Sequence, residues 1–184
     1  MLRILIIFFL FNFLNPALSS TKEKIISKMK ITQNLSFNFI QKIDQKKESG
    51  NCIIKYPKKI YCEYNNLNKK IIVSNGNSLV IKNRNKGSYY LYPLKNTPLE
   101  FILDRNYLIK KINTLEPRII DDRYLNFKII ENNNIINIFF DKKTLNLIGW
   151  QVEDIYKNLT ITFISSVKIN QEIKDSVFIL PKNN

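Results

Sequence analysis

Apolar and polar residues alternate along much of this chain with a period of two. The apolar members of the three clearest runs are Leu35, Phe37 and Phe39, then Leu125, Phe127 and Ile129, and then Leu159, Ile161 and Phe163. Successive side chains on a strand point to opposite faces, so each run predicts a strand that buries its apolar face. Such strands are typical of an antiparallel sheet with one face packed on a core.

Clusters of turn-forming residues separate the apolar runs. They are rich in asparagine and lie at residues 65–66, 75–77, 83–87, 132–134 and 141–143. Asn, Asp and Gly tolerate the backbone conformations that tight hairpins need. The spacing of these turns predicts a meander, so most of the chain is expected to form one antiparallel sheet.

Two segments follow the helical period instead. The first covers residues 22–33, with Thr21 and Lys22 at its start, and its apolar stripe consists of Ile25, Ile26 and Met29. The second is predicted to begin with Thr97 as the N-cap and Pro98 in the first turn. Its apolar side carries Leu99, Ile102, Leu103, Leu108 and Ile109. Together with the sheet, these helices predict an α+β fold.

The periodicity leaves the interior of this fold open. A curved sheet with helices on its one apolar face encloses either a packed core or a lined cavity. Both require the same alternation on the strands and the same apolar stripe on the helices. The pattern alone therefore does not separate them.

Residues 1–19 have the features of an export signal. Arg3 provides a positive start, residues 4–14 are apolar apart from Asn12, and Ser19 ends a stretch suited to signal peptidase. We predict cleavage after Ser19, which leaves residues 20–184 as a single domain that is not lipidated. The apolar run is shorter than the about twenty residues that span a bilayer. A retained membrane anchor is the alternative.

Cys52 and Cys62 are the two cysteines, and their spacing is not that of a metal site. Residues 53–61 predict a strand, a turn around Pro57 and a second strand. A three-residue turn would set the cysteines opposite each other, where an oxidising compartment permits a disulfide. A shift of the register by one residue would leave two free, half-buried thiols, so both states remain open.

The chain is strongly basic, with 29 Lys and Arg against 15 Asp and Glu and a formal net charge of +14. Such a charge attracts nucleic acid, an anionic membrane or an acidic partner. The lysines are scattered over many turns, however, and Lys, Asn and Ile are the residues that AT-rich codons encode. We therefore expect no nucleic acid as a partner.

The absence of histidine excludes several classes of site. A Ser-His-Asp triad, a histidine general base and the common histidine metal sites are all impossible. Asp121 and Asp122 are adjacent and would point to opposite faces of a strand, as would Glu153 and Asp154. The four glycines form no phosphate-binding loop. We expect neither an enzymatic activity nor a cofactor or metal ion.

A series of strand and turn segments keeps a characteristic order over nearly the whole chain after residue 20. The segments are residues 39–45, Gly50, 55–57, 61–64, 72–79, 92–94, 96–99, 140–141, 147–150, 160–163 and 177–181. Each segment alone is unspecific, but their order and spacing resemble the LolA family of periplasmic lipoprotein carriers.

This resemblance implies an incomplete, strongly curved antiparallel β-barrel, with helices that form a lid over a hydrophobic cavity. It implies a monomeric carrier in the periplasm of a Gram-negative bacterium. The carrier takes acylated lipoproteins from an inner-membrane ABC transporter and delivers them to an outer-membrane receptor. The residues expected to line the cavity, or else to belong to an ordinary packed core, are Leu35, Phe37, Phe39, Ile54, Tyr56, Ile60, Leu79, Ile81, Leu99, Ile102 and Leu103.

Tyr56 is the position at which the chain departs from the family pattern. Members commonly have an arginine before this proline, and it helps to latch the lid. A phenol donates one hydrogen bond whereas a guanidinium has five donors, so a weaker or differently built latch is expected. Two other functions remain as alternatives, namely a carrier of a glycolipid or other lipid and a lipoprotein-sensing domain.

Overall fold

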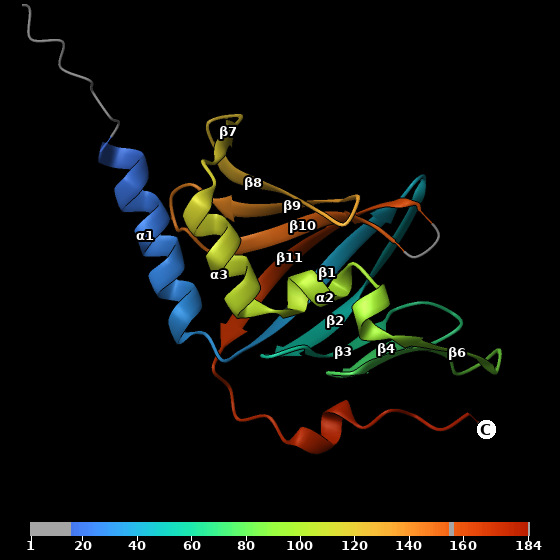
Figure 1. The fold of residues 1–184 in the computed structure, drawn as a ribbon. Helices are drawn as coiled ribbons and strands as arrows, with labels where there is room; N and C mark the ends of the chain where they lie inside the picture. Colours follow the sequence, from blue (N-terminus) through green and yellow to red (C-terminus); the bar gives the residue numbers. More distant parts are fainter. Residues whose placement is uncertain (1–15, 155–156, 184) are drawn as a thin grey trace, which may run out of the picture.

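A computed structural model describes residues 16–154 and 157–183 (Figure 1). In these residues the strands form one eleven-stranded antiparallel sheet in the order β6-β5-β4-β3-β2-β1-β11-β10-β9-β8-β7. The strands are β1 (Asn34–Ile43), β2 (Lys46–Lys55), β3 (Lys59–Tyr64), β4 (Lys70–Asn75), β5 (Ser78–Asn83), β6 (Ser88–Pro93), β7 (Arg118–Ile120), β8 (Tyr124–Glu131), β9 (Asn134–Asp141), β10 (Leu147–Glu153) and β11 (Leu159–Ile169).

The sheet consists of two meanders that meet at its centre. Strands β1 to β6 follow one another on one side, and β7 to β11 do so on the other. The two halves join where β1 pairs with β11. In the described part of the chain β6 and β7 each pair on one side only, so the curved sheet is not closed. This confirms the half-open antiparallel architecture.

The predicted alternation is confirmed on two of the three strands. On β1 the buried apolar residues are Leu35, Phe37 and Phe39, and on β8 they are Leu125, Phe127 and Ile129; Asn34 and Asn126 are buried as well. The predicted turns also lie between consecutive strands. Local sequence therefore determines these hairpins, because each turn and its flanking alternation agree.

On β11 the predicted face is wrong. Leu159 and Phe163 are 49% and 47% exposed, whereas Thr160 and Thr162 are buried. Pairing with the neighbouring strand sets this phase, since Thr162 lies opposite Gln41 on the core side of β1. Gln41 Nε2 donates a hydrogen bond of 3.1 Å to Thr162 Oγ1, so the buried hydroxyl has a partner. Thr160 and Thr162 therefore face the core.

Three α-helices and two short 3₁₀ helices complete the described structure. They are α1 (Pro16–Ile31), η1 (Leu94–Asn96), α2 (Leu99–Leu103), α3 (Arg105–Thr114) and η2 (Asp175–Phe178). Helix α1 begins at Pro16, earlier than the predicted start at Thr21, because proline is well suited to a first helical turn. Its first turn thus precedes the predicted cleavage point after Ser19.

The second predicted helix is two helices in the structure. Asp104 has an extended backbone between α2 and α3, and its Oδ1 accepts a hydrogen bond of 3.0 Å from the Tyr107 N–H as the N-cap of α3. Thr97 does not cap α2, because its hydroxyl donates instead to the carbonyl of Leu94 at 2.9 Å. The break lets the apolar side of each helix reach the sheet independently.

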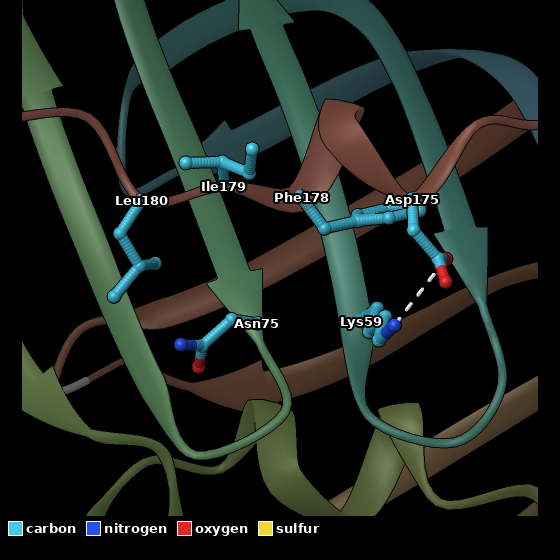
Figure 2. Close-up of a pocket in the computed structure, with 6 residues that line it drawn as sticks. All are labelled: Lys59, Asn75, Asp175, Phe178, Ile179 and Leu180. Carbon is cyan, nitrogen blue, oxygen red and sulfur yellow. Dashed lines mark hydrogen bonds and ion pairs between the residues drawn. The ribbon is translucent and has the colours of Figure 1, made fainter.

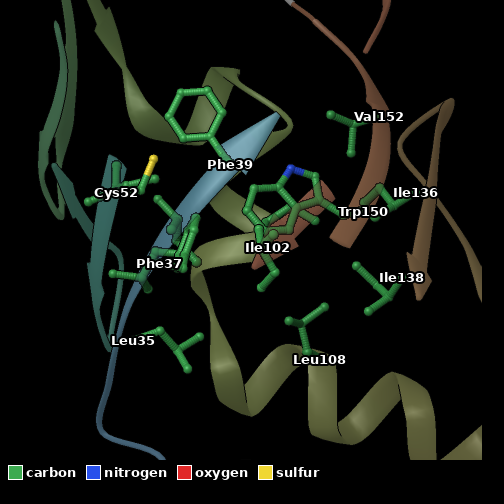
Figure 3. Packing of buried hydrophobic residues seen from close by; sticks show 14 of the residues in the cluster. Leu35, Phe37, Phe39, Cys52, Ile102, Leu108, Ile136, Ile138, Trp150 and Val152 are labelled. Atoms are coloured by element: carbon green, nitrogen blue, oxygen red, sulfur yellow. The ribbon is translucent and has the colours of Figure 1, made fainter. Parts of the chain in front are cut away.

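The core lies between the helices and the apolar face of the sheet (Figures 1 and 3). Figure 3 shows Phe37 and Trp150 from the sheet around Ile102, with Leu108 of α3 beside them. The rings of Phe37 and Trp150 meet edge to face with centroids 6.1 Å apart. Each fully buried large side chain stabilises the fold by about 1.5–3 kcal/mol, so this layer is the main source of stability.

Candidate functional site

A cavity of about 310 Å³ lies beside α1, at the part of the sheet formed by β1 and β9 to β11. Most of its lining is apolar, with Lys28, Thr32, Arg105 and Asn146 as the polar exceptions. The apolar lining consists of Ile25, Met29, Ile31, Leu35, Tyr56, Leu108, Ile138, Phe140, Leu145, Leu147, Val167 and Ile169. Such a surface favours a hydrocarbon ligand, because apolar surface removed from water is stabilised without a specific partner.

Of the predicted cavity residues, the structure brings Leu35 and Tyr56 to this cavity. The others, apart from Ile81, are in or next to the packed core beneath α2 and α3. Seven of these are buried, namely Phe37, Phe39, Ile54, Ile60, Leu79, Ile102 and Leu103. Leu99 and Ile81 are half-buried. The interior thus contains both of the alternatives that periodicity left open, a filled core and a separate cavity.

Sequence reasoning missed the lining that comes from α1, β9, β10 and β11. Ile138 and Phe140 alternate on β9, and this pattern was available in the sequence. What the sequence did not show is that β11 pairs with β1, which brings Val167 near Leu35. Long-range pairing therefore determines where the cavity lies.

Helix α2 is fastened to the sheet by Lys58 in the β2–β3 turn. The Lys58 N–H donates to the carbonyl of Leu103 at 2.8 Å, and its Nζ lies 2.9 Å from Glu100 Oε1 and 3.7 Å from Asp104 Oδ2. The hydrogen bond to Glu100 is the main cause that raises the pKa of the Lys58 amine. This side chain follows Pro57, whereas the expected latch position precedes it.

The Tyr56 hydroxyl makes no hydrogen bond in the described residues, so it does not act as the expected latch. Burial raises the pKa of Tyr56 to about 12, although the nearby Arg105 cation lowers it. The guanidinium of Arg105 lies 5.8 Å from the centre of the Tyr56 ring. Tyr56 therefore contributes a neutral, largely apolar surface to the cavity and supports Arg105.

Arg105 connects α3 to the last turn of α1. Its Nη1 donates to the carbonyl of Thr32 at 2.7 Å and to that of Lys30 at 3.3 Å. Carbonyls at a helix C-terminus lack intrahelical donors, and a cation there is favourable. The Arg105 Nε is buried without a hydrogen-bond partner in the described residues. An arginine thus holds α1, but it comes from α3 and not from the sheet.

Other polar contacts of α1 lie near the surface, and one of them is the hydrogen bond of 3.0 Å that Asn170 Nδ2 donates to the carbonyl of Ile31. Lys22 Nζ forms an ion pair of 2.7 Å with Glu116, just beyond α3. Lys28 Nζ donates to the carbonyl of Thr144 at 2.5 Å and to Asn146 Oδ1 at 3.0 Å, in the β9–β10 turn. Exposed contacts of this kind contribute little stability. The buried side chains of Ile25 and Ile26 therefore provide most of the attachment of α1 to the core.

Helix α3 is also anchored to the sheet, through Tyr107 and Lys111. Tyr107 donates to Glu131 Oε2 at 3.1 Å, and Lys111 Nζ lies 2.6 Å from the same oxygen. The hydrogen bonds from Lys111 and Tyr107 hold the pKa of Glu131 below its usual range. Together with the Lys58 contacts, they anchor α2 and α3 to the sheet.

We predict that Arg105→Gln opens the cavity. Loss of the charged hydrogen bonds to Lys30 and Thr32 should raise the population of the open state, and with it the rate of uptake of a fluorescent fatty acid, about tenfold. Stopped-flow fluorescence measures this rate. Arg118→Gln removes an exposed arginine on β7 and is the matched control. An unchanged rate for Arg105→Gln would show that Arg105 does not hold α1.

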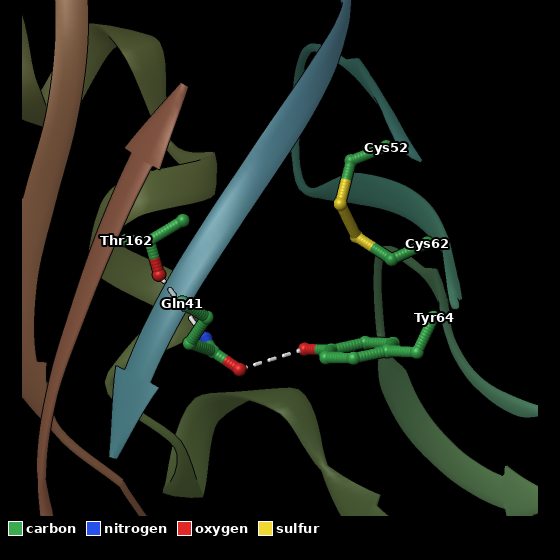
Figure 4. Close-up of a disulfide and its surroundings, with 5 residues drawn as sticks. All are labelled: Gln41, Cys52, Cys62, Tyr64 and Thr162. Carbon is green, nitrogen blue, oxygen red and sulfur yellow. Dashed lines mark hydrogen bonds between the residues drawn. A yellow bond between two sulfur atoms is a disulfide. The ribbon is translucent and has the colours of Figure 1, made fainter. Parts of the chain in front are cut away.

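A disulfide joins Cys52 and Cys62, which lie opposite each other on β2 and β3 (Figure 4). The bond is buried, and the pairing is the register that a three-residue turn produces. Figure 4 also shows Gln41 between Thr162 and Tyr64. The Tyr64 hydroxyl donates a hydrogen bond of 3.0 Å to Gln41 Oε1. The disulfide and this polar chain fix the central strands, so the sheet is a rigid base for the cavity.

The C-terminal segment, residues 170–183, packs on the outer face of β3 and β4 (Figure 2). Phe178 is buried, and Asp175 Oδ1 lies 2.8 Å from Lys55 Nζ and 3.3 Å from Lys59 Nζ. A hollow of about 420 Å³ beside it is lined by Lys59, Asn75, Asp175, Phe178, Ile179 and Leu180. The hollow is shallower than the cavity beside α1, and Lys59, Asn75 and Asp175 are polar, so it suits a hydrocarbon ligand less well.

Neither a candidate metal site nor a candidate membrane-spanning helix occurs in residues 16–154 and 157–183. No cluster of three or more His, Cys, Asp or Glu residues there could hold a metal ion. None of the described helices is both long and apolar enough to cross a membrane. The cavity beside α1 is therefore the feature from which we infer a function.

Comparison with known proteins gives a family match and several similar folds. The family model described as outer membrane lipoprotein carrier protein LolA matches residues 30–180. A LolA superfamily protein from Nitrosomonas europaea has 9% identity and a TM-score of 0.48, covering 89% of this chain and 97% of that chain. LprF from Mycobacterium bovis has 10% identity and a TM-score of 0.49, covering 87% and 97%. No curated protein matches.

Proposed function

Because the chain belongs to the LolA family of outer membrane lipoprotein carrier proteins, we propose that it carries acylated lipoproteins across the periplasm. The cavity of about 310 Å³ beside α1 is the observation that carries this proposal. It would receive acyl chains, which α1 then covers. The packed layer under α2 and α3 would act as the fixed wall of the site.

The route that we propose begins with export. A signal at residues 1–19 would direct the chain to the periplasm and be removed, which leaves residues 20–184 as the carrier domain. The described residues do not include 1–15, so this step rests on the sequence. The carrier would accept its cargo from an inner-membrane ABC transporter and release it at the outer membrane, without nucleotide or metal of its own.

Burial of hydrocarbon explains why such a cargo needs a carrier. Each methylene transferred from water contributes about 0.8 kcal/mol, so several long acyl chains exposed to water carry a penalty of tens of kcal/mol. The cavity volume is near the lower end of the about 300–1,000 Å³ that is usual for ligand sites. A complete set of chains therefore requires α1 to move outward, and its few polar contacts would permit this.

The experiment that tests the proposal is capture of the natural cargo. The full chain with a C-terminal affinity tag is recovered from the periplasm without detergent, and bound molecules are identified by native mass spectrometry. We expect acylated lipoproteins, compared with an unrelated exported protein that carries the same tag. Free lipid or glycolipid alone would support the alternative of a lipid carrier, and an empty protein would overturn both.

A further inference from the structure

The β3–β4 turn presents an apolar side chain to solvent. Leu67 is 93% exposed, the largest value among the large apolar residues in the described part of the chain. An exposed leucine alone needs no explanation, since much of any protein surface is apolar. Leu67 differs from other exposed apolar residues because it lies in a turn, away from the packed core.

The turn that bears Leu67 is held out by an ordered set of hydrogen bonds. From the β5–β6 turn, Asn85 Nδ2 donates to the carbonyl of Leu67 at 2.5 Å, and the Asn85 N–H donates to that of Asn68 at 3.2 Å. The Lys70 N–H donates to Asn66 Oδ1 at 3.1 Å within the turn. The two turns therefore form one rigid tip, which we call the Leu67 tip (residues 65–69 and 84–87).

The chain around this tip is cationic over a long stretch. No Asp or Glu occurs from residue 64 to residue 99, and the cations in that stretch are Lys69, Lys70, Lys82, Arg84, Lys86 and Lys95. Lys70 and Arg84 are paired with Glu48 and Glu63. Lys69 and Lys86 are exposed at the tip and form no ion pair in the described residues. The tip thus combines free positive charge with a projecting leucine.

The edge strand β6 extends this surface with amphipathic side chains. Tyr90 and Leu91 are 45% and 56% exposed. Tyrosine and leucine beside lysines are typical of protein surfaces at a membrane interface, where the ring enters the headgroup layer and the cations meet anionic lipids. Because adjacent residues of a strand point to opposite faces, Tyr90 and Leu91 flank the edge strand next to the tip on its two sides.

We propose that the Leu67 tip binds an anionic phospholipid surface, with Leu67 inserted among the acyl chains and Lys69 and Lys86 at the headgroups. The projecting side chain favours a lipid surface over an acidic protein, because a fluid bilayer accommodates a protrusion without a matching pocket. This inference rests on the proposed function and deepens it, since the tip would bring the carrier to the membrane that receives its cargo. One leucine and a few cations give weak, reversible contact, as a shuttle requires.

Cosedimentation of the full chain, freed of cargo, with lipid vesicles tests this inference. We expect binding to phosphatidylcholine vesicles that contain phosphatidylglycerol, and little binding to phosphatidylcholine alone. Leu67→Asn should weaken binding at least about tenfold, as expected for loss of one buried leucine. Lys69→Gln with Lys86→Gln should weaken it about 25-fold, at about fivefold for each cation near an anionic surface.

Matched variants separate the tip from general effects. Ile179→Asn changes an apolar residue that is 71% exposed on the C-terminal segment, and Lys24→Gln with Lys110→Gln removes two exposed lysines from the helices. Both should bind the vesicles as the natural chain does. Equal losses in these variants, or no binding to anionic vesicles, would overturn the inference. Uptake of a fluorescent fatty acid should be unchanged in Leu67→Asn. Failure of membrane binding can therefore be told apart from failure of the carrier function.

Discussion

Replacing Gly50 with alanine is expected to lower the free energy of unfolding by about 3 kcal/mol or more. A Cβ at this position would lie 2.0 Å from the carbonyl oxygen of Glu63 and 2.9 Å from Cε1 of Phe39. The first clash is with the backbone of β3, which cannot move without loss of the β2–β3 pairing. Overpacking of this kind costs more than loss of an ordinary contact.

The lack of a side chain at Gly50 allows two aromatic rings to meet in the core. Gly50 lies opposite Phe39 on β1 and Tyr64 on β3. The rings of these two residues meet edge to face across it, with centroids 4.8 Å apart. A glycine between two aromatic residues lets their rings cover the bare backbone and lets the sheet curve. Alanine would push the rings apart as well as the strands.

Denaturation by urea, followed by circular dichroism, measures this loss. Gly87→Ala is the matched control, because a Cβ there has no neighbour within 4 Å and only its φ of +68° opposes the side chain. That variant should lose about 1–2 kcal/mol. Losses of the same size in the two variants would mean that the contacts of Gly50 in the sheet carry no additional penalty.

Filling the cavity should abolish most acyl binding without harm to the fold. Leu147→Trp places a larger side chain on β10, where Leu147 is half-buried and lines the cavity of about 310 Å³. Each methylene excluded loses about 0.8 kcal/mol, so exclusion of two already lowers the affinity for a fluorescent fatty acid about tenfold or more. Fluorescence titration measures this affinity.

Leu159→Trp is the control for the added indole. Leu159 begins β11 but is 49% exposed, so a tryptophan there does not enter the cavity. The control should bind the fatty acid with unchanged affinity. If Leu147→Trp also retains full affinity while its free energy of unfolding is unchanged, the acyl chains bind elsewhere in the protein.

The sequence predicted those parts of the fold that are determined locally. On β1, Phe37 and Phe39 alternate between polar residues and are buried, and asparagine-rich turns follow where the chain reverses. In these segments propensity, periodicity and turn chemistry agree. The pairing of Cys52 with Cys62 follows from the same local geometry, since a three-residue turn sets the register.

Features that depend on distant partners were not predicted correctly. Thr162 is buried because it pairs with Gln41, more than a hundred residues earlier, and the polar side chain gave no sign of this. Most of the cavity lining was missed for the same reason. Lys58 holds α2 through Glu100 and the Leu103 carbonyl, and Arg105 holds α1 through backbone carbonyls; such contacts leave no periodic pattern in a sequence. Tertiary pairing overrides local preference at these positions.

The pairing of β1 with β11 determines when the complete sheet can form. The first and last strands of the chain are neighbours at the centre of the sheet. Hairpins within each half can form as soon as they leave the ribosome, but the halves join only when residues 159–169 are available. Long-range pairing of this kind is intrinsically slow. The complete sheet therefore stays open, as two separate halves, until its last long strand is available.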